Sequence, residues 1–147
     1  MALAPDPLVP DTYAPRILVI DDDPVVRDSV QALLEYFGYE CGIAADGHSG
    51  LKRLEGETWD LVITDLMLAG MTGWQVIDAI RGRGPGMPVI LTTGVDDPSV
   101  RTRVRQCQVS LLLKPFRLDE LKAALVDALY ARAPFPQTPG RLPARSG

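Results

Sequence analysis

The sequence predicts an α/β fold, a doubly wound domain built around a parallel sheet. Short apolar segments alternate along the chain with stretches in which apolar residues recur at helical spacing, which is the pattern of repeated strand and helix units. The apolar segments lack regular polar alternation, as is typical of strands covered on both faces. A chain of 147 residues, 46% of them hydrophobic, is also long enough to bury roughly 70% of its unfolded surface as one domain.

Five strands are expected, each rich in Val, Ile or Leu. They are Arg16–Ile20, Tyr39–Ala44, Leu61–Thr64, Val89–Thr93 and Leu111–Leu113. A helix is expected between the first two strands, because Pro24 suits its first turn and Gly38 its end. Further helices are expected near residues 48–55, 74–82, 98–107 and 118–130.

Proline marks the ends of the predicted domain. Eight of the 13 prolines lie in residues 1–15 and 131–147. Proline donates no backbone hydrogen bond and breaks helix interiors, so both flanks are predicted to be extended or disordered tails. The ordered domain is therefore expected over residues 16–130.

Composition and charge argue against several classes of protein. A net charge of −4 disfavours direct binding to nucleic acid, whose phosphates are bound through clustered Lys and Arg. The two cysteines, Cys41 and Cys107, are too few for a disulfide framework and, with His48 as the single histidine, match no zinc spacing, which favours a reducing cytoplasm. No signal peptide is visible, and no apolar segment approaches the roughly 18 residues that span a bilayer.

Three adjacent carboxylates follow the first predicted strand, where ILVI leads into Asp21, Asp22 and Asp23. Such a cluster repels itself unless a cation, a positive side chain or full solvation offsets the charge. Asp23 suits a helix N-cap because Pro24 follows it. Asp21 and Asp22 lie where open α/β sheets bind ligands. Taken by itself, the triplet is compatible with either a metal site or a solvated loop.

Three further strand ends carry polar side chains, namely Asp65, Thr93 and Lys114. By itself, Thr93 is an ordinary β-branched strand residue and Lys114 an exposed turn residue. If the strands are parallel, however, these ends converge with Asp21 and Asp22 at one edge of the sheet. Carboxylates, a hydroxyl and an ammonium group together suit Mg²⁺ and a phosphoryl group, with one carboxylate as the nucleophile.

The sequence resembles the receiver domain of two-component response regulators. The motifs that carry the resemblance are ILVIDDDP, DLVITDLMLAGMTG, PVILTTG and LLLKPF, and together they extend it over residues 16–130. The resemblance implies a flavodoxin-like sheet of five parallel strands in the order 2-1-3-4-5.

The matched positions imply the roles of the reacting groups. Asp65 corresponds to the phosphoacceptor, Thr93 to the switch hydroxyl and Lys114 to the phosphate-binding lysine. A phosphohistidine would donate the phosphoryl group, and the hydroxyl of Thr93 would then bind a phosphate oxygen and reposition the loop and helix that follow it.

The resemblance also implies a Mg²⁺ site. Asp21 and Asp22 correspond to the acidic pair that binds the ion, together with Asp65 and the backbone carbonyl of Met67. Magnesium suits such a site because it prefers octahedral oxygen ligands and keeps several waters beside a few carboxylates. None of these positions departs from the pattern in its side chain, which favours an active receiver.

The resemblance implies protein partners. A sensor histidine kinase or a histidine phosphotransfer protein would supply the phosphoryl group, and a downstream protein would receive the signal. The segment after residue 130 is too short for an output domain, so we expect a stand-alone regulator, a phosphorelay shuttle or a receiver cut from a larger hybrid kinase.

Two other functions remain open on the sequence. One is a Mg²⁺-dependent phosphohydrolase with an aspartyl-phosphate intermediate, although Met67 stands where such enzymes usually have an acid/base carboxylate. The other is a scaffold of receiver fold that acts without phosphorylation. Within the receiver hypothesis, Met67 and Val95 occupy positions where polar side chains help to place a hydrolytic water, so their apolar character predicts slow self-dephosphorylation.

Overall fold

The structure is a computed structural model that describes residues 14–130. The predicted tails, apart from Ala14 and Pro15, lie outside the described residues, so the domain boundaries stay a prediction. No helix among residues 14–130 is long and apolar enough to cross a membrane.

Five parallel strands form the central sheet. They are β1 (Arg16–Ile20), β2 (Glu40–Ala44), β3 (Leu61–Asp65), β6 (Val89–Thr93) and β7 (Ser110–Leu113). Their order across the sheet is β2-β1-β3-β6-β7, which is the predicted order once the five strands are counted along the chain. The doubly wound α/β fold is thus confirmed.

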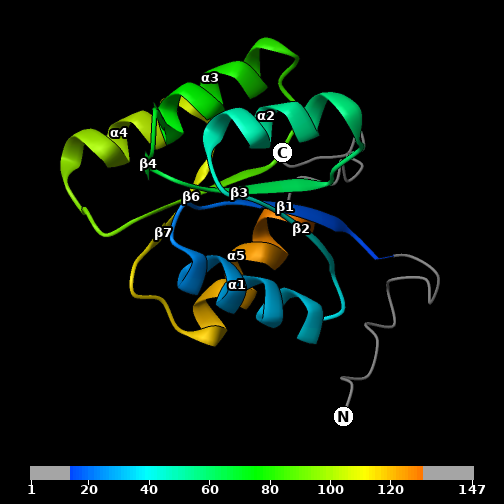
Figure 1. Ribbon diagram of the computed structural model, residues 1–147. Coiled ribbons are helices and arrows are strands. Elements are labelled where there is room, and N and C mark those ends of the chain that lie inside the picture. The colour runs from blue at the N-terminus through cyan, green and yellow to red at the C-terminus, as the bar shows by residue number, and fades with distance from the viewer. Residues whose placement is uncertain (1–13, 131–147) are drawn as a thin grey trace, which may run out of the picture.

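Helices cover both faces of this sheet (Figure 1). On one face lie α1 (Pro24–Tyr36) and α5 (Leu118–Tyr130), and on the other lie α2 (Gly47–Gly56), α3 (Gly73–Gly82) and α4 (Pro98–Cys107). Each face has its own apolar core, in which alternate residues of β1 take part: Ile17 and Val19 on one side, Leu18 and Ile20 on the other. The three inner strands β1, β3 and β6 are therefore buried on both faces, as their apolar sequences predict, whereas the edge strands β2 and β7 are partly exposed.

One hairpin, made of two short strands, was not predicted from the sequence. A two-residue strand β4 (Met67–Leu68) pairs with β5 (Met71–Thr72) in an antiparallel hairpin directly after β3. Gly70 allows the turn, because its φ of +75° is strained for residues with a side chain. Strands of two residues are too short to produce a periodic pattern, which explains why the sequence does not reveal them.

Side-chain caps set where the helices begin. Asp23 caps α1, as predicted, by accepting a hydrogen bond from the backbone N–H of Val25 at 3.0 Å, and Pro24 occupies the first turn. Thr72 and Gln75 form a reciprocal capping box at the start of α3. These caps place the amino ends of the helices at the edge of the sheet where the strands end.

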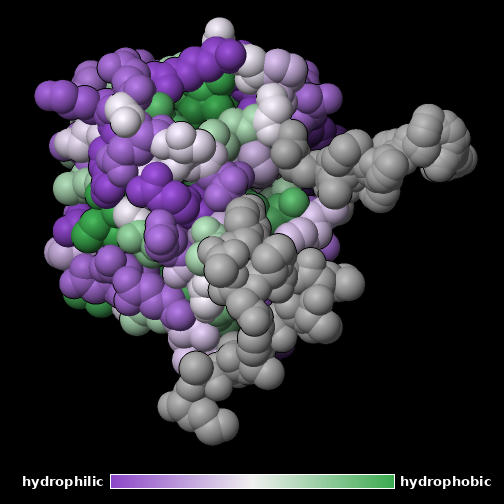
Figure 2. Space-filling view, turned by 90° about the vertical axis from the view of Figure 1, so that its right-hand side faces the viewer, coloured by the Kyte–Doolittle hydropathy of each residue, from purple (hydrophilic) through white to green (hydrophobic). Residues whose placement is uncertain are grey.

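Figure 2 faces the opposite end of the domain, where the strands begin. On the part of this face that is coloured, hydrophilic residues predominate and hydrophobic ones appear in small separate patches (Figure 2). Arg16, for example, bonds here to the carboxylates of Glu40 and Glu57. The polar side chains singled out from the sequence lie at the other end, the carboxyl edge of the sheet.

Candidate functional site

Parallel pairing brings the predicted residues to one edge. Ile20 is paired with Thr64, so Asp21, which follows β1, and Asp65, the last residue of β3, lie at the same level. Asp65 is paired with Thr92 and Thr93 with Leu113, which places Lys114 in the next position. The convergence inferred from the sequence is therefore present in the structure.

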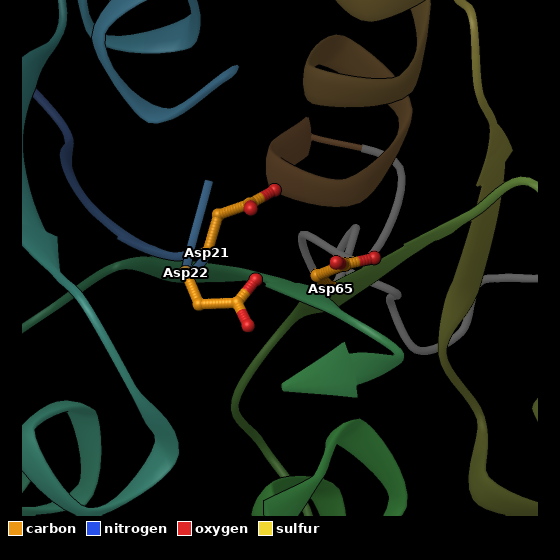
Figure 3. A group of neighbouring side chains, drawn as sticks. All are labelled: Asp21, Asp22 and Asp65. Carbon is orange, nitrogen blue, oxygen red and sulfur yellow. The ribbon is translucent and has the colours of Figure 1, made fainter. Parts of the chain in front are cut away.

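Three carboxylates form an acidic cluster at this edge, composed of Asp21, Asp22 and Asp65. One oxygen from each lies within 4.8 Å of the others. Asp21 and Asp65 are 3% and 9% exposed, whereas Asp22 is exposed (Figure 3). Oxygen ligands at this spacing, two of them buried and one open to solvent, match the preference of a small hard cation that retains some of its waters.

Lys114 is the positive charge of the site. Its Nζ lies 3.2 Å from Oδ2 of Asp21 and 3.4 Å from Oδ1 of Asp65. Burial alone would lower the pKa of Lys114, but the charges of Asp65 and Asp21 and the hydrogen bonds to them outweigh it, so its pKa lies above the usual value. The ammonium group therefore stays protonated and bridges two carboxylates. The peptide bond from Lys114 to Pro115 is cis.

Burial and neighbouring charge shift the pKa of Asp65. Desolvation raises its pKa, the charge of Asp21 raises it further, and Lys114 opposes both without cancelling them. Lys114 offsets only part of the cost of burying the negative charge of Asp65. A bound cation, or a modification that changes the charge of Asp65, would reduce that cost further. A carboxylate whose pKa is raised by burial and by a like charge, beside a lysine, is a candidate for chemistry rather than for structure alone.

Asp21 is fixed from several directions. Its N–H donates to the carbonyl of Ala44 at 3.2 Å, and its Oδ1 accepts the N–H of Asp23 at 2.9 Å. Its backbone carbonyl accepts a hydrogen bond from Nη1 of Arg27 at 2.9 Å. Sequence reasoning did not single out Arg27, because helical spacing alone does not show that its side chain returns to the strand end.

Thr93 lies at the carboxyl edge but is not joined to the acidic cluster. Its side chain is 2% exposed, and its hydroxyl accepts the N–H of Val95 at 3.1 Å. Within residues 14–130 this hydroxyl makes no hydrogen bond to a carboxylate. It is therefore engaged with the loop that leads to α4, the segment that the resemblance expects to move.

Exposed apolar side chains accompany the acidic cluster. Four of the seven large hydrophobic residues that are exposed in the described part of the chain follow shortly after strand ends at this edge: Val25, Met67, Val95 and Leu118. We call these four the apolar rim. Met67 is 66% and Val25 73% exposed, so both are open to contact with another molecule.

Comparison with known proteins gives a consistent result. A family model described as the response regulator receiver domain matches residues 17–126. The chain is similar to the response regulator MprA of Mycobacterium tuberculosis, with 34% identity over 120 residues, which are 81% of this chain and 52% of MprA. It is 33% identical over 108 residues to the probable transcriptional regulatory protein TcrX of the same species, covering 71% of this chain and 45% of TcrX. The chain thus spans about half the length of these relatives.

Solved structures show the same fold. A CheY-like receiver domain protein from Methanospirillum hungatei superposes with a TM-score of 0.75 and 30% identity, over 80% of this chain and 94% of that one. The chemotaxis protein CheY4 of Vibrio cholerae has a TM-score of 0.74 and 26% identity, over 80% of this chain and all of CheY4.

Proposed function

Because the chain belongs to the response regulator receiver family, we propose that its Asp65 accepts a phosphoryl group from a phosphohistidine, with the help of Mg²⁺, and that this modification switches its contacts with a downstream protein. The observation that carries the proposal is the bridging of Asp21 and Asp65 by Lys114 beside a third carboxylate. A nucleophile, a metal-binding pair and a phosphate-binding cation then share one edge of the sheet.

In the proposed reaction an oxygen of Asp65 attacks the phosphorus of the donor. A new O–P bond forms while the P–N bond to the donor imidazole breaks, and its electron pair stays on the imidazole nitrogen. Lys114, 3.4 Å from Oδ1 of Asp65, is placed to offset negative charge on the transferring oxygens. The hydroxyl of Thr93 then exchanges its bond with the N–H of Val95 for one to the phosphoryl group.

The residues present fit Mg²⁺. Asp21, Asp22 and Asp65 offer only oxygen atoms, and few of them, as Mg²⁺ accepts when it keeps waters. In the proposal the carbonyl of Met67 joins them. The bound ion would supply positive charge for the transferring phosphoryl group.

The apolar rim supports a protein as phosphodonor. A phosphohydrolase for small molecules would need a polar, enclosed pocket and an acid/base group near Asp65, yet the side chain two residues later is the exposed thioether of Met67. Exposed apolar side chains beside the charged site are instead of the kind that a protein partner buries at an interface. We propose a sensor histidine kinase or a histidine phosphotransfer protein as the donor.

Receiver domains are in general signalling modules rather than metabolic enzymes. We propose that this chain acts in the cytoplasm, supported by two cysteines that are unpaired in the structure. The prediction that it makes no contact with nucleic acid is not supported by the comparisons, since TcrX is named a probable transcriptional regulator and extends well beyond the matched region.

The proposal is tested with a small phosphodonor. Incubation of the protein with acetyl phosphate and Mg²⁺ should add the mass of one phosphoryl group, detectable by intact-protein mass spectrometry. Asp65→Asn should abolish the adduct, and omission of Mg²⁺ should slow its formation strongly. An adduct that persists in Asp65→Asn would refute Asp65 as the acceptor, and no adduct on the wild type would favour a scaffold that acts without phosphorylation.

A further inference from the structure

We propose that Arg27 is a positioning residue, which holds the turn of Asp21 and Asp22 in the geometry that binds Mg²⁺. This inference rests on the proposed function. Arg27 lies in α1, where its backbone N–H bonds to the carbonyl of Asp23. Its side chain returns along the chain, and Nη1 donates to the carbonyl of Asp21 at 2.9 Å.

The carbonyl of Asp21 needs this donor because the ladder ends there. The pairing of β1 with β2 stops at Ile20 and Ala44, and the N–H of Asp21 makes the last bond, to Ala44. In a parallel ladder the next bond would come to the carbonyl of Asp21 from β2, but the chain turns there into α2, which is capped by Asp46. Asp21 is 3% exposed, so a carbonyl left without a donor would be costly.

The bond restrains the backbone that carries both metal-binding carboxylates. The carbonyl that Arg27 holds belongs to the peptide unit that joins Asp21 to Asp22, so the bond restrains the rotation of that unit. The carboxylate of Asp21 has its own partners in Lys114 and the N–H of Asp23, whereas the side chain of Asp22 is exposed. The position of Asp22 therefore depends on its backbone, and Arg27 is the side chain that bonds to it.

Charge and geometry make opposite predictions for Arg27. As a positive charge near the acidic cluster, Arg27 repels Mg²⁺. If only this charge mattered, removing Arg27 would tighten metal binding. As a hydrogen-bond donor, Arg27 keeps the ligands in place, so its removal would weaken metal binding. Among residues 14–130 no ion pair neutralises Arg27. The sign of the change in affinity therefore decides between the two roles.

The test is a calorimetric Mg²⁺ titration of the wild type, Arg27→Met and Arg27→Lys, with the melting temperature of each metal-free protein measured in parallel. Arg27→Met should weaken Mg²⁺ binding by about tenfold, as is usual when a partner of a metal ligand is lost. Arg27→Lys keeps a donor of nearly the same reach and should recover most of the affinity. Arg105→Met, which removes an exposed arginine of α4, is the matched control and should leave the affinity unchanged.

Each alternative result is decisive. Tighter binding by Arg27→Met would show that Arg27 acts only as a repelling charge, and a lower melting temperature with unchanged affinity would show a merely structural role; both overturn the inference. If Arg27→Met does not fold, Arg27→Gln, which is too short to keep the bond, takes its place with the same expected loss. Absence of Mg²⁺ binding by the wild type is a separate result, which would refute the proposed metal site and the inference together.

Discussion

At the scale of one residue, the buried carboxylate of Asp65 lowers the stability of the folded protein when it is ionised. Burial and the charge of Asp21 raise its pKa despite Lys114, so the folded protein binds this proton more tightly than the unfolded chain does. The protonated form of Asp65 therefore contributes its full stabilisation below the ordinary pKa of an aspartate. This contribution is lost as the pH rises through the higher pKa that Asp65 has in the folded protein. At neutral pH the ionised Asp65 lowers the free energy of unfolding.

The first prediction follows from that sign. In Mg²⁺-free buffer at pH 7, Asp65→Asn should unfold at a higher denaturant concentration than the wild type, because the amide removes a buried charge. The difference should narrow as the pH falls towards 3.8, the ordinary value for an aspartate. Asp28→Asn, an exposed carboxylate of α1, provides the control and should shift stability much less. A destabilised Asp65→Asn at pH 7 would show that the pair with Lys114 outweighs burial.

The second prediction concerns the lifetime of the phosphorylated state. Hydrolysis needs a water in line with the bond between Asp65 and phosphorus, and the exposed side chains of Met67 and Val95 can neither orient that water nor accept its proton. After removal of the phosphodonor, Met67→Asn/Val95→Glu should therefore lose phosphate faster than the wild type. Val25→Asn, which alters the apolar rim without entering these positions, serves as the control. Equal rates would mean that these two side chains do not govern access of water.

The residues that converge at the site could be predicted from the sequence, whereas the residues that hold them in place could not. Asp65 and Lys114 end apolar segments, and the parallel sheet then brings such ends together. Arg27 was missed because it bonds to a backbone carbonyl. Every residue has such a group, so no residue type in the sequence identifies it as a hydrogen-bond partner. The carbonyl of Met67, whose role was inferred from resemblance, remains a prediction for the same reason.

At the scale of elements, α3 is seated directly against the strand that carries Asp65. The N–H of Gly73 donates to the carbonyl of Leu66 at 2.7 Å. A Cβ at Gly73 would lie 2.5 Å from the carbonyl oxygen of Asp65 and 2.9 Å from the Cα of Leu66. Both obstacles are backbone atoms, so only glycine allows this close approach.

The third prediction tests this contact. Gly73→Ala should lower the free energy of unfolding by about 1–3 kcal/mol, because the extra methyl overpacks a rigid site. It should also slow phosphorylation by acetyl phosphate, since the strain falls on the backbone of Asp65. Gly82→Ala, where the added methyl meets no atom within 4 Å beyond its chain neighbours and the nearby backbone of its own helix, is the matched control in the same helix. If Gly73→Ala were as stable as the wild type, α3 would have to move away from β3 with no loss in the free energy of unfolding.

Predictability also differed among elements. The five strands and five helices were predicted because each extends over enough residues to show periodicity or an apolar segment. The hairpin of β4 and β5 was missed, although it holds Met67 at the edge of the site. Its two-residue strands depend on the turn at Gly70 and on the fit of Met71 against Gly47 of α2, which are tertiary features.

At the scale of the whole molecule, the fold brings together acidic residues that lie far apart in the chain. Asp21 and Asp65 are held close by the pairing of β1 with β3, whereas in the unfolded chain they separate. Their repulsion is thus a property of the folded state, and so is any affinity for a divalent cation. A ligand that binds only the folded state raises the free energy of unfolding according to its concentration and dissociation constant.

The last prediction is that Mg²⁺ stabilises the protein with millimolar-class affinity, because few charged ligands are offered and several waters remain on the ion. At a Mg²⁺ concentration ten times the dissociation constant, the free energy of unfolding should rise by about 1.4 kcal/mol, which corresponds to a rise of a few degrees in melting temperature.

Asp22→Asn should reduce this rise in melting temperature, since it removes the exposed ligand and leaves the buried pair with Lys114 intact. NaCl at matched ionic strength separates specific binding from screening, because it screens charge to the same extent without supplying a divalent cation. If NaCl reproduced the rise, or if Asp22→Asn responded as the wild type does, the acidic cluster would not be a magnesium site.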